Sequence, residues 1–135
     1  MAVFVDTSAW YALTSASDRE HVAAVRTYRD LVERDEVLVT TSYVLAETMA
    51  LIQRRLGLEP LTRFAAAAKT VEVIWIDSEY HALAENLLFE RRRRRLNIVD
   101  AASMVAMRER GIKVAFAFDP SFRHEGFRLL GAAGR

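Results

Sequence analysis

The sequence predicts an α/β fold, with one domain of residues 1–135 built around a mainly parallel β-sheet. Short runs rich in Val, Ile and Phe alternate with longer amphipathic segments almost throughout the chain. This alternation is typical of β-strands connected by helices. The chain has 135 residues, of which 52% are hydrophobic, and this is enough for the core of one compact domain.

The expected strands are short and apolar, and most are rich in β-branched side chains. In chain order they cover residues 2–6, 37–40, 71–76, 113–118 and, as a fifth short strand, 127–130. The last five residues, 131–135, are expected to lie outside the regular elements.

The expected helices lie between these strands, at 7–14, 18–34, 42–57, 59–69, 78–93 and 98–110. Ser17 and Glu20 have the spacing of a capping box at the start of the second helix. Ser42 is expected to open the third helix and Gly57 to close it. One face of the second helix is marked by the apolar positions Val22, Val25, Tyr28, Leu31 and Val32.

Composition excludes several classes of protein. The 19 basic and 18 acidic residues nearly cancel, so net charge neither indicates nor excludes nucleic-acid binding. The absence of cysteine excludes disulfides, thiolate metal sites and cysteine nucleophiles, and is compatible with the cytoplasmic location that we expect. No apolar run is long enough for a membrane span, and the N-terminus lacks the pattern of a signal peptide, so we expect no membrane contact.

Five of the 18 acids stand in apolar surroundings, whereas most of the others lie among charged residues on helix faces. These five are Asp6, Glu47, Asp77, Asp100 and Asp119. Helix capping is the simpler explanation for Asp6, Asp77 and Asp119, because each precedes an expected helix and Asp is a favoured cap. Asp6 and Asp119 also follow expected strands, and sites in parallel sheets form beyond the carboxyl ends of strands.

Capping does not explain Glu47, which lies in mid-helix among apolar residues. Asp100 lies in the first turn of an apolar helix, where the helix dipole favours an anion, but the helix has little polar face. A buried acid without a partner raises its pKa and becomes neutral. Several buried acids together are better explained by a divalent cation, and carboxylate oxygens suit Mg²⁺ or Mn²⁺.

Four segments together resemble the PIN-domain ribonucleases, in particular the VapC-type toxins of bacterial toxin–antitoxin pairs. They are Val5-Asp6-Thr7-Ser8, Glu47, Asp100 and Phe118-Asp119. The similarity runs over nearly the whole chain and continues in Phe122 and Gly126-Phe127. It implies a three-layer α/β/α sandwich with strand order 3-2-1-4-5, which would bring Asp6 beside Asp119.

The resemblance also implies an activity, namely Mg²⁺-dependent endonucleolytic cleavage of RNA. Asp6, Glu47, Asp100 and Asp119 would bind one or two Mg²⁺ ions, with Asp6 and Asp100 as the most direct ligands and Mn²⁺ as a substitute. A bound divalent ion can activate water for attack on a phosphodiester and offset charge on the phosphoryl oxygens.

Three further residues are candidates for a supporting role. Thr7 and Ser8 would hold a ligand acid or a phosphate oxygen, although helix capping explains them equally well. Asn97 stands where the family often has Ser or Thr. Asn can still cap the helix and donate a hydrogen bond, so we expect activity to survive, while its part in substrate contact stays open.

The implied partners are a second copy of the chain, in a homodimer, and a VapB-type antitoxin. The antitoxin's C-terminal segment would lie over the active-site groove. The amphipathic helices at 18–34 and 42–57 could supply that groove, or their apolar faces could belong only to the core.

The run from Arg91 to Arg95 is the clearest charge anomaly, because without it the chain is net acidic. It is either a solvated helix end that suits the helix dipole or a phosphate-binding edge close to Asp100.

Two other functions are compatible with parts of the sequence. A non-catalytic PIN-like RNA-binding module is the main alternative, but the complete set of acids argues against it. An aspartyl phosphatase with Asp6 as nucleophile is disfavoured, because Ser8 occupies the position where such enzymes typically place a second acid. The sequence contains no nucleotide-binding loop of the form GxxxxGK[ST] or GxGxxG.

Overall fold

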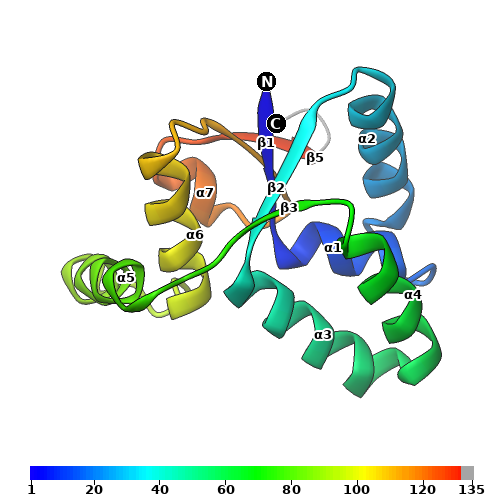
Figure 1. Ribbon diagram of the computed structural model, residues 1–135, viewed down its shortest axis with the longest axis horizontal. Helices are drawn as coiled ribbons and strands as arrows, with labels where there is room; N and C mark the ends of the chain where they lie inside the picture. Colours follow the sequence, from blue (N-terminus) through cyan, green and yellow to red (C-terminus); the bar gives the residue numbers. More distant parts are fainter. Residues whose placement is uncertain (132–135) are drawn as a thin grey trace.

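The computed structural model describes residues 1–131, and a five-stranded sheet forms its centre (Figure 1). The strand order is β3-β2-β1-β4-β5, and every neighbouring pair is parallel. This confirms the α/β class that the sequence predicted and the strand order that the family resemblance implied. The strands are β1 (Ala2–Val5), β2 (Val37–Thr41), β3 (Glu72–Ile74), β4 (Val114–Ala117) and β5 (Arg128–Gly131).

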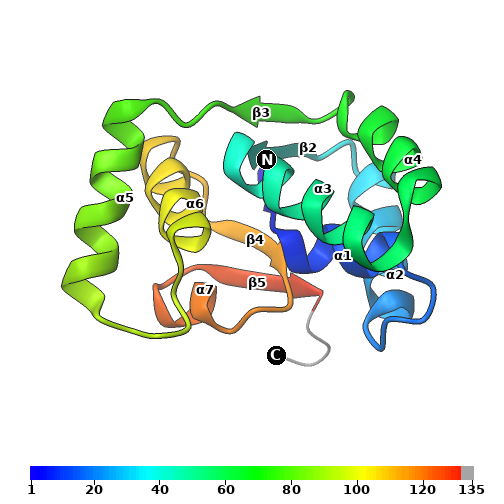
Figure 2. The same ribbon diagram turned by 90° about the horizontal axis from the view of Figure 1, so that it is seen from below.

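Helices cover both faces of the sheet, as expected for a three-layer sandwich. In Figures 1 and 2, α1, α2 and α4 lie on one side and α5, α6 and α7 on the other, while α3 extends away from the carboxyl end of β2. The helices are α1 (Thr7–Thr14), α2 (His21–Glu33), α3 (Ser42–Leu56), α4 (Leu58–Ala68), α5 (Ser78–Arg91), α6 (Ile98–Glu109) and α7 (Ser121–His124).

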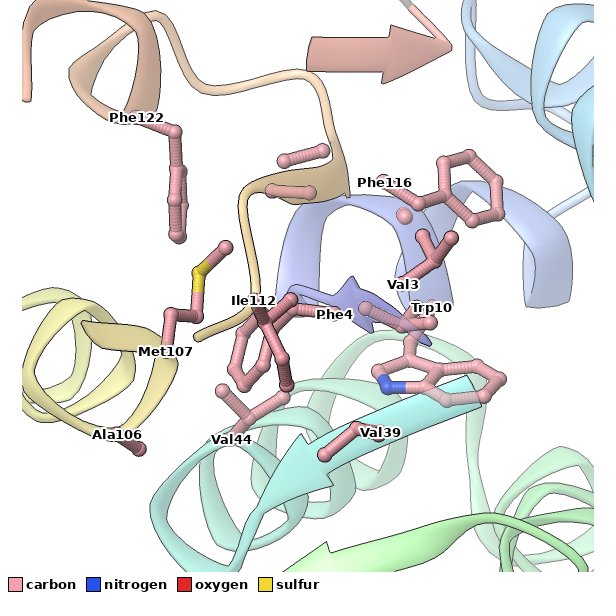
Figure 3. Packing of buried hydrophobic residues seen from close by; sticks show 14 of the residues in the cluster. Val3, Phe4, Trp10, Val39, Val44, Ala106, Met107, Ile112, Phe116 and Phe122 are labelled. Atoms are coloured by element: carbon pink, nitrogen blue, oxygen red, sulfur yellow. The ribbon is translucent and has the colours of Figure 1, made fainter. Parts of the chain in front are cut away.

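The core lies between the central strands and the helices on either face. Phe4 of β1 and Phe122 of α7 are both fully buried, with ring centroids 6.3 Å apart. Figure 3 shows these two rings and the Met107 side chain of α6 pointing toward one another. Burial of such large apolar side chains is the main favourable contribution to folding, and here it joins elements from both ends of the chain.

The start of the second helix differs from the prediction. It begins at His21, and Ser17 does not cap it. Instead, the Asp18 carboxylate accepts a hydrogen bond from Glu20 N at 2.8 Å, so an Asp turn replaces the expected capping box. The predicted apolar face is also wrong in part, because Val22 is 69% and Val32 51% exposed. Leu31 of the predicted face is buried as expected, and it is joined in the core by Ala24, which the prediction did not include.

Helix α3 begins at Ser42 and is closed by Gly57, as expected. Its side-chain cap is Thr41, which accepts from Val44 N, whereas Ser42 Oγ accepts from Ile76 N at 2.9 Å and so fixes the chain after β3. Helix α5 ends at Arg91 because Arg92 adopts a left-handed conformation, with φ of 53°. The short α7 was not predicted.

The part of the chain that the structure describes ends with β5. Gly131 completes β5, so it does not lie outside the regular elements as expected, while residues 132–135 fall outside the described part of the chain. At Gly131 φ is +101°, and a Cβ there would lie 3.1 Å from the rings of both Phe116 and Phe118. Glycine therefore meets both the backbone and the space requirement. Within residues 1–131, no helix has the length and hydrophobicity needed to cross a membrane.

Candidate active site

The sheet brings four of the predicted acids to its carboxyl edge. In Figure 1, β1 runs into α1 and β2 runs into α3 at this edge. A pocket of about 500 Å³ opens there, and Asp6, Glu47, Asp100 and Asp119 all line it. The candidate residues Thr7, Ser8 and Asn97 line the same pocket.

Asp6 is both a helix cap and a wall of the pocket. Its backbone N–H donates to Phe116 O of β4 at 3.1 Å, which places the residue between the end of β1 and the start of α1, beside β4. Its side chain accepts from Ser8 N and caps α1, which confirms the capping interpretation. The residue is only 3% exposed.

The Ser8 hydroxyl connects two of the acid-bearing segments. It donates to Asp6 Oδ2 at 2.8 Å and accepts from Phe118 N at 2.9 Å. Phe118 directly precedes Asp119, so one hydroxyl orients the Asp6 carboxylate and fixes the backbone beside Asp119. Asp119 itself accepts from Ser121 N at 2.9 Å at the start of α7.

Thr7 plays the corresponding part for Glu47. Its hydroxyl donates to Glu47 Oε1 at 2.7 Å and accepts from the buried Thr48 hydroxyl at 3.3 Å. The Glu47 side chain is thereby tied across from α3 to the first residue of α1. Thr7 and Ser8 thus hold one acid each, which is the first of the two roles proposed for them.

Asn97 holds the fourth acid through a capping box. Its side chain accepts from Asp100 N at 2.9 Å, and Asp100 Oδ2 accepts from Asn97 N at 3.1 Å. The predicted capping role of Asn97 is therefore confirmed. Asp77 is also a cap, since it accepts from Tyr80 N at 2.9 Å, and it does not line the pocket.

Burial and mutual repulsion change the titration of two of these acids. Burial raises the pKa of Asp6 to about 6, helped by the charge of Asp119 and opposed by the hydrogen bonds from Ser8. Burial also raises the pKa of Asp100 to about 7, and the charges of Asp6, Asp119 and Glu47 act in the same direction. Like charges close together disfavour the ionised form, so the site holds more negative charge than its surroundings compensate.

The donor chemistry suits a hard divalent cation, but the geometry is open. Within residues 1–131, no three acidic or histidine side chains lie close enough together to ligate one ion directly. Mg²⁺ commonly keeps several water molecules and contacts one or two carboxylates. The repulsion between Asp6 and Asp100 is the kind of strain that a cation relieves, so the pocket fits a largely hydrated ion.

Sequence reasoning missed two features of this region. Arg54 lines the pocket together with Arg95, and Arg54 could have been found because it lies seven residues after Glu47, on the same helix face. Glu125 accepts from the guanidinium groups of Arg91, Arg93 and Arg108. Nothing in its sequence surroundings marks Glu125 as a buried acid.

The fold agrees with comparisons to known proteins. The PIN domain family model matches residues 3–127. The chain therefore belongs to the PIN-domain family. Over 127 residues it is 35% identical to the 23S rRNA-specific endonuclease VapC20 of two Mycobacterium tuberculosis strains, covering 93% of this chain and 95% of the relative.

Two solved structures are also similar to this chain. The crystal structure of M. tuberculosis VapC20, described as a sarcin–ricin loop cleaving toxin, matches with a TM-score of 0.83 over 93% of this chain and 95% of that one. VapBC2 from Rickettsia felis, bound to a DNA fragment from its promoter, matches with a TM-score of 0.70 and 12% identity over 96% and 97% of the two chains. The second match supports the fold alone.

The raised pKa of Asp100 predicts a pH-dependent stability difference. The Asp100 carboxyl holds its proton more tightly in the folded protein than in the unfolded chain, where its pKa has the ordinary value of 3.8. The stability that Asp100 contributes is therefore present below pH 3.8 and lost as the pH rises through about 7. Without divalent ions, Asp100→Asn should become more stable relative to wild type as pH increases, by up to ~1.4 kcal/mol per pH unit over this window.

Thermal unfolding in EDTA at several pH values measures this difference. Glu109→Gln is the control, since Glu109 is exposed and lies on the same helix. Its difference from wild type should not change over the window. A constant difference for Asp100→Asn would contradict the predicted repulsion.

Proposed function

We propose that this protein is a Mg²⁺-dependent endoribonuclease and the toxin of a type II toxin–antitoxin pair. The observation that carries the proposal is the meeting of four acids, from distant parts of the chain, in one pocket at the carboxyl edge of the sheet. The relationship to a 23S rRNA-specific endonuclease, 35% identical over nearly its full length, supports RNA as the substrate. Structured ribosomal RNA containing the sarcin–ricin loop is the first substrate to test.

The residues of the pocket divide into ligands and their supports. Asp6 and Asp100 would hold the cation most directly, with Glu47 and Asp119 acting through water or completing a second position. The divalent ion would supply activation of a water molecule and neutralisation of charge on the phosphoryl oxygens. Thr7 and Ser8 orient Glu47 and Asp6 by the hydrogen bonds described above, and preorganised groups of this kind are what rapid chemistry requires.

Removal of one ligand acid tests the catalytic role. We expect Asp6→Asn to reduce RNA cleavage by at least ~100-fold, the scale on which positioned catalytic groups act. Asn keeps the shape and can still cap α1, so folding should be retained. Cleavage of a sarcin–ricin loop RNA, resolved on a gel, is the measurement, and Glu109→Gln is the matched loss of one exposed acid.

Undiminished cleavage by Asp6→Asn would overturn the acid-pocket mechanism. RNA binding without cleavage by the wild-type protein, in Mg²⁺ or Mn²⁺, would favour the alternative of a non-catalytic RNA-binding module.

Binding of the ion can be measured without any substrate. Because Mg²⁺ would bind the folded protein and relieve the repulsion between Asp6 and Asp100, it should raise the unfolding temperature of the wild type. The increase should be larger at pH 8 than at pH 5, since both carboxyls are ionised at pH 8. Asp100→Asn should lose most of it, and an equal response of the two proteins would argue against a cation at this site.

We also propose a VapB-type antitoxin and a second copy of the chain as partners. Of the two helices that could supply the antitoxin groove, α3 lines the acid pocket through Glu47, Ala50, Leu51 and Arg54. Tyr28 of α2 lines a separate pocket of about 360 Å³ together with Trp10 and Phe64. For the dimer, the support is exposed apolar surface, since Trp75 is 72% and Phe89 66% exposed.

Each partner has a direct test. Co-expression with the product of the neighbouring small gene should abolish RNA cleavage, and undiminished cleavage in a stable mixture would exclude it as antitoxin. Sedimentation of the purified chain should show twice the monomer mass, and a monomer at micromolar concentration would contradict the dimer.

A further inference from the structure

Two arginines line the acid pocket, although they belong to different elements. Arg54 lies near the end of α3, and Arg95 lies in the loop between α5 and α6. Both are exposed. Within the part of the chain described, 1–131, neither guanidinium takes part in a hydrogen bond or ion pair, whereas Arg91, Arg93 and Arg108 are held by Glu125.

Helix geometry places Arg54 at the pocket. Glu47, Ala50, Leu51 and Arg54 all line it, and their spacing of three, four and seven residues corresponds to one face of a helix. The helix thus presents an acid and, two turns later, a cation to the same space. The neighbouring Arg55 instead lies over the Tyr11 ring, with Cζ 5.4 Å from the centroid, so the two arginines have different surroundings.

The loop that carries Arg95 is fixed at both ends. Before it, Arg93 binds the Glu125 carboxylate at 3.3 Å, and the Glu125 side chain is only 5% exposed. After it, Leu96 is 1% exposed in the core, and Asn97 caps α6. The arginines of the run therefore have different roles: Arg91 and Arg93 hold the loop through Glu125, while Arg95 lines the pocket and has no partner among residues 1–131.

We propose that Arg54 and Arg95 bind backbone phosphates of the RNA strand on either side of the bond that is cleaved. This inference rests on the proposed function and extends it to substrate positioning. An RNA strand approaching four acids meets repulsion, and two guanidinium groups beside them offset it. Arginine binds phosphate oxygens through two parallel hydrogen bonds, and such contacts set the register of a strand without reading its sequence.

RNA binding measured without cleavage tests this directly. Each arginine is changed to Gln in the Asp6→Asn background, and affinity for the sarcin–ricin loop RNA is measured in EDTA over a range of KCl concentrations. Each phosphate contact that is lost should lower the slope of log K against log salt by roughly 0.7 to 1. We expect Arg54→Gln and Arg95→Gln each to weaken RNA binding several-fold and to reduce the slope by this amount. The double variant should weaken binding and reduce the slope further.

Arg94→Gln is the matched control, because Arg94 is exposed in the same loop, carries the same charge and does not line the pocket. It should leave the salt slope and RNA cleavage close to wild type. Arg95→Lys should keep the salt slope and recover part of the affinity, because the charge remains and the two-pronged geometry is lost.

The outcomes separate this inference from the proposed function. If the wild type cleaves RNA and the two pocket variants match Arg94→Gln in affinity and slope, the phosphate contacts are overturned and the nuclease stands. If the wild type does not cleave RNA, the proposed function fails whatever the arginines do. The inference is supported if Arg54→Gln and Arg95→Gln reduce the salt slope while Arg94→Gln does not, and if thermal unfolding of the variants is unchanged.

Discussion

The parallel pairing of β1 with β4 is the constraint on which the site depends. It joins Phe4 to Ala115 and Val5 to Phe116, and it continues in the hydrogen bond from Asp6 N to Phe116 O. Because both strands point the same way, the loops that follow them leave the sheet at the same edge. The Ser8 hydroxyl then accepts a hydrogen bond from the backbone N–H of Phe118, 110 residues later in the sequence. Without this pairing, Asp6 and Asp119 would have no reason to share a pocket.

The site is held together by small polar groups, because its acids repel one another. Four carboxylates line one pocket, and burial with mutual repulsion raises the pKa of Asp6 and Asp100. The opposing contributions are modest individual hydrogen bonds from Thr7, Ser8 and Asn97. A buried like-charge cluster lowers stability in the absence of a counter-ion, and sites that perform chemistry often carry such strain.

The sequence was sufficient to predict the strands, their alternation with helices and the acids in apolar surroundings, since each of these depends on local pattern. The strand order and the meeting of Asp6 with Asp119 came from the family resemblance and are confirmed by the sheet. Predictions from local pattern failed where a tertiary contact determines the role of a side chain. Ser42 has the chemistry of a cap, but it bonds to Ile76 from a neighbouring segment. Glu125 becomes a buried partner of arginines only because α5, α6 and α7 meet.

The close approach of Gly131 to Phe116 and Phe118 links β5, at the outer edge of the sheet, to the acid pocket. Phe118 occupies the space that a side chain at position 131 would need, and its backbone is bonded to the hydroxyl that orients Asp6. A larger residue at the end of β5 would therefore displace the ring next to Asp119 as well as straining its own backbone. The pocket thus depends on the size of a residue that never touches it, so loss of activity in a variant need not map to the acids themselves.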